Sequence, residues 1–138
     1  MKFPKFLLVF AVTVLTLLVL AGCNSFTGIR NDFEKAGYTY SEEAAQYVEE
    51  LMEEFESEKI NVRPHLFTKG LNYAIVLEFN SVKELEEELE KSETLKGLVK
   101  DFQKTDLVRG NCVLIPVAVA LDYKERIQEM IDIFQGRK

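Results

Sequence analysis

The sequence is poor in the residues that most enzymes use at a catalytic or metal centre. It contains one histidine, His65, and two cysteines, Cys23 and Cys112. A histidine-based catalytic triad therefore has one candidate base, and a zinc site has one candidate nitrogen ligand. The sequence contains no phosphate-binding glycine loop, no Gly-x-Ser-x-Gly motif and no Cys-x-x-Cys pair. We therefore expect no catalytic set, no metal centre and no cofactor.

Positive charge is also scarce. Lysine and arginine number 17 against 23 aspartates and glutamates, which gives a net charge of −6. Without residues 1–22, which hold Lys2, Lys5 and no acid, 15 basic residues stand against 23 acidic ones, a net charge of −8. Binding to nucleic acid depends on clustered lysine and arginine, so we expect no nucleic-acid partner. An anionic lipid surface also repels a body of this charge.

The N-terminal segment has the pattern of an export signal. Residues 1–5 carry two lysines and no acid, and residues 6–20 form an apolar run that only two threonines interrupt. The run is about as long as a signal-peptide core and is shorter than the roughly 20 residues that a membrane-spanning helix needs. Lysines before such a run hold the N-terminus on the cytoplasmic side, so the rest of the chain is expected to be exported.

The apolar run ends in Leu20-Ala21-Gly22-Cys23. This segment resembles the lipobox of a bacterial lipoprotein signal peptide, and the resemblance covers residues 1–23. It implies cleavage between Gly22 and Cys23, followed by attachment of a diacylglyceryl group to the Cys23 thiol. Two acyl chains, such as palmitate, anchor a protein stably, whereas one chain binds only marginally. The alternative is an uncleaved N-terminal anchor in which the cysteine is incidental.

The resemblance implies a division of the chain into a signal peptide (1–22), a lipidated cysteine with a short polar tether (23–30) and a domain (31–138). The domain resembles no family strongly, but it is long enough to bury a core of its own. Lipidation of Cys23 leaves Cys112 without a partner in the chain. Cys112 lies in an apolar run that predicts a buried strand, and an intermolecular disulfide is the alternative.

Hydrophobic periodicity predicts an α+β domain. Alternation favours strands over 38–40 and 71–79, and strands are also expected over 60–67 and over the apolar run 112–117. Helical spacing favours helices over 42–57 and 122–135. Two shorter helices are expected after the N-caps Ser81 and Ser92, and one or two helical turns over 31–36 with Gly37 as the stop. This β-α-β-β-α-β order with an extra C-terminal helix is the ferredoxin-like order, with an antiparallel sheet and helices on one face.

Two features of the domain, a glutamate-rich helix and the single histidine, can each be interpreted as structural or as functional. The helix over 42–57 carries seven glutamates, which we interpret as a solvated face rather than a metal site, because the spacing matches no ligand loop. His65 lies beside Pro64 in an expected edge strand and is interpreted as a surface or rim histidine. The alternative is a haem or metal ligand in a small ferredoxin-like enzyme or haem-handling protein.

The sequence therefore favours a non-enzymatic binding or accessory lipoprotein, lipid-anchored through Cys23 on the extracytoplasmic side of the cell membrane. Its partner would be a protein or a small ligand, and a homodimer is left open. The alternative is the small enzyme or haem-handling protein. No residue is assigned to ligand binding.

Overall fold

The computed structural model describes residues 25–41, 48–100 and 105–137, although nothing is said of the side chains of residues 99, 100 and 105. The signal peptide, its cleavage site at Gly22 and the lipidation site Cys23 lie outside these residues and stay predictions. Within the described ranges, no helix is long and apolar enough to cross a membrane.

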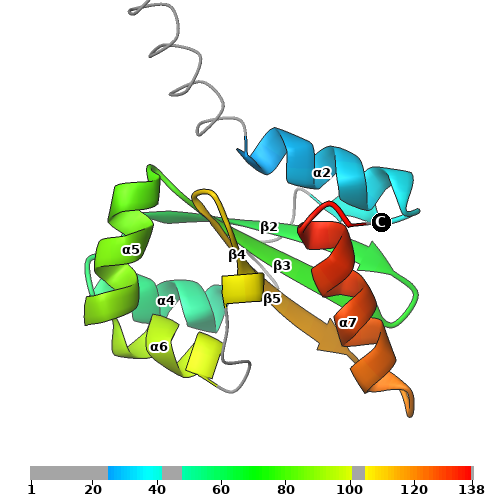
Figure 1. The fold of residues 1–138 in the computed structure, drawn as a ribbon. Coiled ribbons are helices and arrows are strands. Elements are labelled where there is room, and N and C mark those ends of the chain that lie inside the picture. The colour runs from blue at the N-terminus through cyan, green and yellow to red at the C-terminus, as the bar shows by residue number, and fades with distance from the viewer. Residues whose placement is uncertain (1–24, 42–47, 101–104, 138) are drawn as a thin grey trace, which may run out of the picture.

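An antiparallel five-stranded sheet forms the centre of the fold, in the order β1-β2-β3-β5-β4 (Figure 1). Its strands are β1 (Thr39–Ser41), β2 (Val62–Lys69), β3 (Asn72–Phe79), β4 (Val108–Arg109) and β5 (Cys112–Ala118). The helices of the described residues are α2 (Ser25–Lys35), α4 (Glu49–Ser57), α5 (Val82–Lys91), α6 (Glu93–Lys100) and α7 (Tyr123–Phe134), with a short 3-10 turn, η1 (Thr105–Leu107). The predicted α+β class, antiparallel sheet and C-terminal helix are confirmed.

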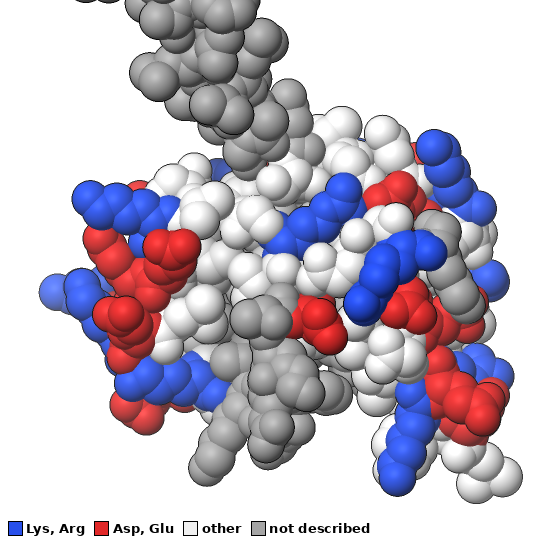
Figure 2. All heavy atoms as spheres, viewed as in Figure 1, with Lys and Arg blue, Asp and Glu red and all other residues white. Residues whose placement is uncertain are grey.

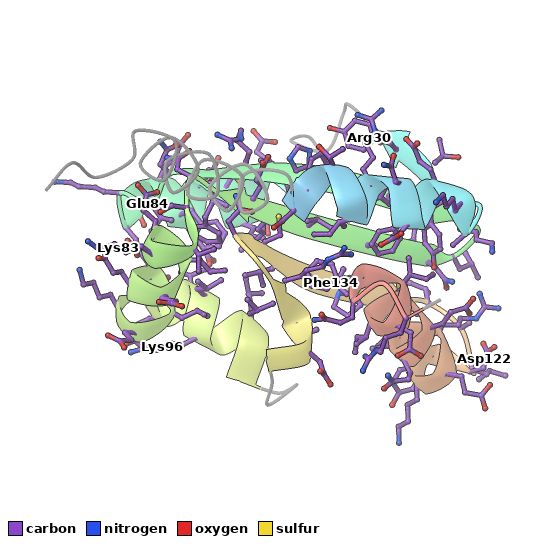
Figure 3. All side chains as sticks on the ribbon, turned by 45° about the horizontal axis from the view of Figure 1, so that its top comes forward. Arg30, Lys83, Glu84, Lys96, Asp122 and Phe134 are labelled. Atoms are coloured by element: carbon purple, nitrogen blue, oxygen red, sulfur yellow. The ribbon has the colours of Figure 1, made fainter. Side chains whose placement is uncertain are left out.

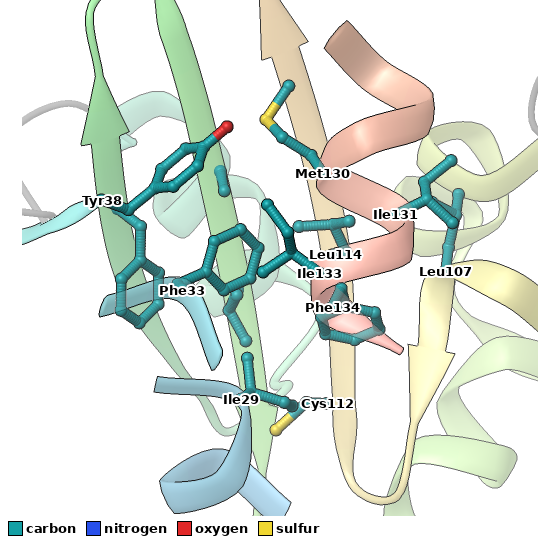
Figure 4. Close-up of a cluster of buried hydrophobic side chains, with 13 residues drawn as sticks. Ile29, Phe33, Tyr38, Leu107, Cys112, Leu114, Met130, Ile131, Ile133 and Phe134 are labelled. Atoms are coloured by element: carbon teal, nitrogen blue, oxygen red, sulfur yellow. The ribbon is translucent and has the colours of Figure 1, made fainter. Parts of the chain in front are cut away.

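One face of the sheet packs against α2 and α7. Because side chains alternate between the faces of a strand, Phe67, Val76 and Leu114 share this face with their cross-strand neighbours. They form a core with Phe33 of α2 and Phe134 of α7, and all five side chains are almost completely buried (Figure 4). The same core includes Ile29, Tyr38, Ala74, Leu107, Cys112, Met130, Ile131 and Ile133.

The opposite face packs against the helices between the strands. Leu77 of β3 and Val113 of β5 are buried with Phe55 of α4, Leu85 of α5 and Leu95 of α6. Helices therefore cover both faces of the sheet, and the expectation of helices on one face only is wrong. The second layer arises because α2 and α7, at the two ends of the domain, pack together on the face that the other helices leave uncovered.

The ferredoxin-like strand order is not formed. That order is a split β-α-β arrangement, in which a further strand separates the two strands of a β-α-β unit. Here β1 and β2 are direct antiparallel neighbours, and so are β3 and β5. The three residues of β1 pair with Leu66–Thr68 near the end of β2, so the chain returns beside β1 instead of crossing over to add a parallel strand.

The tether predicted over 23–30 is wrong for residues 25–30, which are helical. Phe26, Ile29 and Phe33 recur on one side of α2, and Ile29 and Phe33 are completely buried. The glycine at position 28 is the reason that this segment was expected to be a tether. In the structure Gly28 lies where α2 approaches Arg109, and a Cβ added to Gly28 would lie 3.2 Å from Nη2 of Arg109. The folded domain therefore includes residues 25–30, and Gly37, with φ +91°, follows α2 as its stop.

The remaining predicted elements agree with the structure within a few residues. Ser81 accepts a hydrogen bond from the Glu84 amide at 3.1 Å, and Ser92 accepts one from the Leu95 amide at 3.0 Å, so both are N-caps. The described part of the predicted helix over 42–57 is α4, and residues 42–47 lie outside the described residues. A turn at residues 110 and 111 joins β4 to β5.

Gly110 in this turn gives a test of how closely α2 packs. An added Cβ there would overlap the Ser25 hydroxyl and lie 2.8 Å from Ser25 Cβ, whereas one at Gly70 would meet nothing within 4 Å. Both glycines have φ near +60°, so Gly70→Ala should cost about 1–2 kcal/mol of unfolding free energy from backbone strain alone. We expect Gly110→Ala to cost more, because the first turn of α2 must also move. Equal losses in urea unfolding would contradict this packing.

Candidate functional site

The most concentrated set of polar and aromatic contacts in the described chain surrounds His65. We call Phe26, Tyr40, Arg63, His65 and Glu78 the His65 cluster. Phe26 lies in α2 and Tyr40 in β1. Arg63 and His65 lie in β2, and Glu78 lies in β3. The β2–β3 register sets Arg63 opposite Glu78 and places His65 on the same face, so these side chains meet as a consequence of strand pairing.

Both ring nitrogens of His65 have hydrogen-bond partners. Nδ1 lies 2.8 Å from the Tyr40 hydroxyl, and Nε2 lies 3.0 Å from Oε1 of Glu78. An ionised carboxylate only accepts hydrogen bonds, so Nε2 carries the proton and its N–H donates a hydrogen bond to Glu78. The lone pair on Nδ1 then accepts from the Tyr40 hydroxyl. Neutral His65 is fully satisfied in this tautomer.

Phe26 connects α2 to this network. Its ring stacks on the His65 ring with centroids 3.7 Å apart and an interplanar angle of 22°. Arg30, one turn further along α2, places its guanidinium 4.1 Å from the centre of the Tyr40 ring. Such cation–π contacts contribute about 0.5–1 kcal/mol at exposed sites. The cluster thus attaches the first turns of α2 to β1 and β2.

The ionisation states follow from these surroundings. Burial lowers the pKa of His65 below its usual 6.5, and the positive charges of Arg63 and Arg30 lower it further, against the opposing effect of Glu78. Burial alone would raise the pKa of Glu78, but hydrogen bonds from Arg63 and His65 hold that pKa below its usual value. At pH 7 the cluster therefore holds a neutral imidazole and an ionised carboxylate.

The hydrogen bonds form a chain from a phenol through an imidazole to a carboxylate. In chemical terms, His65 can accept the Tyr40 proton while Glu78 orients the ring, which is the arrangement of an activated nucleophile. A haem iron or metal ion at His65, however, would have to displace Tyr40 or Glu78 from a ring nitrogen. Among the described residues, no three histidine, cysteine, aspartate or glutamate side chains form a group that could hold a metal ion.

Two open depressions lie beside the acidic helices, and Asn80 in the lining of the second accepts a hydrogen bond from Arg63 at 3.1 Å. One of about 400 Å³ is lined by Glu58, Ser92 and their neighbours, and one of about 290 Å³ by residues that include Asn80 and Glu84. The Glu58 carboxylate accepts hydrogen bonds from the hydroxyls of Ser92 and Thr94, and these hold its pKa below the usual value. Glu58 thus joins the end of α4 to the start of α6. The glutamates of α4 are exposed, as predicted.

The prediction that Cys112 is a buried core residue is confirmed. Its side chain is inaccessible to solvent, with Sγ 3.7 Å from the Oδ1 of Asn111. Burial raises the pKa of the Cys112 thiol to about 12, and the nearby negative charge of Glu78 adds to the effect. The reactive form of cysteine is the thiolate, so this residue is inert in the folded protein.

Part of the His65 cluster was within reach of sequence reasoning. Lys69 and Gly70 separate the strands expected over 60–67 and 71–79, and counting back from a turn there pairs Arg63 with Glu78. We expected His65 at a rim, but its side chain is only 13% exposed. Tyr40 and Phe26 were missed, because no local pattern shows that β1 and α2 meet beside β2.

Comparisons with protein-family models, with curated proteins and with solved structures found no match for this chain.

Proposed function

We propose that this chain is a lipoprotein, anchored in the cell membrane through Cys23 with its domain on the extracytoplasmic side, and that it acts as a non-enzymatic binding or accessory module. One observation carries the proposal: the lipobox ends two residues before the first element that the structure describes. Cleavage between Gly22 and Cys23 would leave every described helix and strand intact, because the first of them begins at Ser25.

The hydrogen bonding of the buried polar side chains supports a binding role. In the described residues, every buried side-chain nitrogen and oxygen has a hydrogen-bond partner. The His65 cluster follows this pattern, since its hydrogen bonds join β1, β2 and β3, and the stack of Phe26 on His65 attaches α2. Large apolar side chains are instead exposed at the opposite end of the sheet, at Leu71 before β3 and at Val119 after β5, which is consistent with contact to a protein partner.

Replacing Cys23 by alanine tests the anchor. We expect the native N-terminal peptide to carry a diacylglyceryl group on Cys23 in mass spectrometry and the protein to enter the detergent-rich phase on detergent phase separation. The Cys23→Ala protein should show neither a lipid adduct nor cleavage after Gly22, because the thiol is the acceptor. Cys112→Ala is the matched control and should keep the lipid. An unmodified Cys23 in the native protein would overturn the proposal.

The alternative function, a small enzyme or haem-handling protein, is favoured by one observation, the Tyr40–His65–Glu78 chain. It predicts that added haem produces a Soret shift that is lost in His65→Gln. Because both ring nitrogens already have partners, we expect no shift in the native protein.

A further inference from the structure

The anchor and the folded domain are separated by very little chain. Two residue steps join Cys23 to Ser25, and an extended chain covers at most about 3.6 Å per residue, or about 7 Å in all. The lipid on Cys23 would therefore lie next to the first turn of α2. We infer that this end of the domain rests directly on the lipid headgroups in one fixed orientation, an inference that rests on the proposed function.

The residues around Ser25 define the surface concerned. We call Ser25, Thr27, Arg63, Arg109 and Gly110 the anchor-side surface. Gly110 lies so close to Ser25 that an added Cβ would overlap the Ser25 hydroxyl, and Figure 1 shows the β4–β5 turn near the start of α2. The guanidinium of Arg109 contacts α2 at Gly28, and Arg63 belongs to the His65 cluster that holds Phe26.

The orientation is fixed because α2 cannot swing away from the domain. Ile29 and Phe33 are completely buried in the core, and Phe26 is stacked on His65. Arg109 adds a polar connection, since its Nη1 donates to Asp32 of α2 at 2.9 Å and to the carbonyl of Phe134 at 3.0 Å. An anchor fixed to the start of α2 is thus fixed to the whole domain.

The distribution of charge favours the same orientation. Arg30 and Arg63 are about half exposed, and each pairs with one carboxylate while keeping further N–H donors for a phosphate. Figure 2 shows acidic side chains together with basic ones over α5 and over the lower part of α7, whereas the visible face beside the start of α2 carries mainly white and blue atoms. Anionic headgroups attract the arginines near the start of α2 and repel the carboxylates over α5 and α7.

Depth measurement on the lipidated protein tests the inference. A fluorescent label on Thr27→Cys would report the start of α2, and a label on Glu125→Cys would report the start of α7. Figure 3 shows α7 running from Asp122, at the far end of the molecule, to Phe134 near α2. Both sites are exposed, so the labels leave the core intact, and buried Cys112 does not compete for the label.

The proteins are reconstituted in vesicles of equal parts phosphatidylethanolamine and phosphatidylglycerol that contain a lipid with a nitroxide on its headgroup. We expect loss of most of the fluorescence at position 27 and no loss at position 125. Mass spectrometry of the same sample reports the lipid on Cys23. An absent lipid overturns the proposed function. A lipidated protein that is quenched equally at both sites, or more at position 125, overturns the inferred orientation while the anchor stands.

Discussion

Replacing Phe33 by alanine is expected to lower the free energy of unfolding by about 3–5 kcal/mol, because the substitution removes a buried aromatic ring and leaves a cavity. Phe33 is completely buried. Its ring stacks on Phe67 with centroids 4.9 Å apart and meets the edge of Tyr38 at 5.1 Å. Both neighbours lose contacts that only α2 provides. Urea unfolding of the purified protein measures the effect.

Lys35→Ala, on the exposed side of the same helix, is the control for this experiment. It should change the free energy of unfolding by less than about 0.5 kcal/mol, as is usual for surface substitutions. If Phe33→Ala proved equally mild, α2 would be a dispensable appendage. The domain would then be free to move about its anchor, and the inferred orientation at the membrane would lose its physical basis.

The misassignment of α2 shows where sequence reasoning failed. The spacing of Phe26, Ile29 and Phe33 is helical, but Gly28 and the polar residues around it favoured a tether. A glycine in a helix usually lowers the stability of that helix by about 1 kcal/mol relative to alanine. The structure shows the compensating reason, which is the close approach of Arg109 to Gly28. That contact joins residues far apart in the sequence, so no local pattern could predict it.

The sheet shows a similar division between local and distant information. Alternation predicted β3, an apolar run predicted β5, and residues 60–67 were also expected to form a strand, which is β2. Ala74 and Val76 make the second face of β3 apolar, and both side chains are buried in the core with α2 and α7. The strand order could not be predicted in the same way. β1 has only three residues, and its place beside β2 depends on pairing with residues 66–68 rather than on any feature of its own sequence.

The His65 cluster was predictable to the extent that it depends on one hairpin. Strand pairing brings Glu78 to Arg63, and both residues lie in strands that the sequence predicted. The contacts that bury His65 come from Tyr40 and Phe26, which reach it through tertiary packing. This is why a residue expected at a rim is largely buried and has a lowered pKa.

Acidification is expected to destabilise the protein, beginning near pH 6.5, and His65 is the cause. The folded-state pKa of His65 lies below its ordinary value of 6.5, so the unfolded chain binds a proton more readily than the folded one. The contribution of His65 to the free energy of unfolding is therefore fully present above its pKa in the unfolded chain. It is lost as the pH falls through its lower pKa in the folded protein. The groups facing the ring act in both directions: Arg63 and Arg30 oppose its protonation, and Glu78 favours it.

The chain offers a clean test, because His65 is its only histidine. His65→Gln should be less stable at pH 7 by about 1–3 kcal/mol, since Tyr40 and Glu78 lose a buried partner and Phe26 loses its stack. Its unfolding free energy should also vary less than that of the native protein between pH 7 and 5. Below that range Glu78, whose pKa is also lowered, adds a loss as the pH falls through its folded value.

Urea unfolding across this pH series therefore separates the two groups. Parallel curves for the native protein and His65→Gln between pH 7 and 5 would show that His65 does not control the loss. A difference in slope confined to that window would show that the imidazole holding Phe26 also sets the acid stability of the attachment of α2. Because α2 follows Cys23 in the sequence, the same titration would weaken in acid the orientation that we infer for the domain at the membrane.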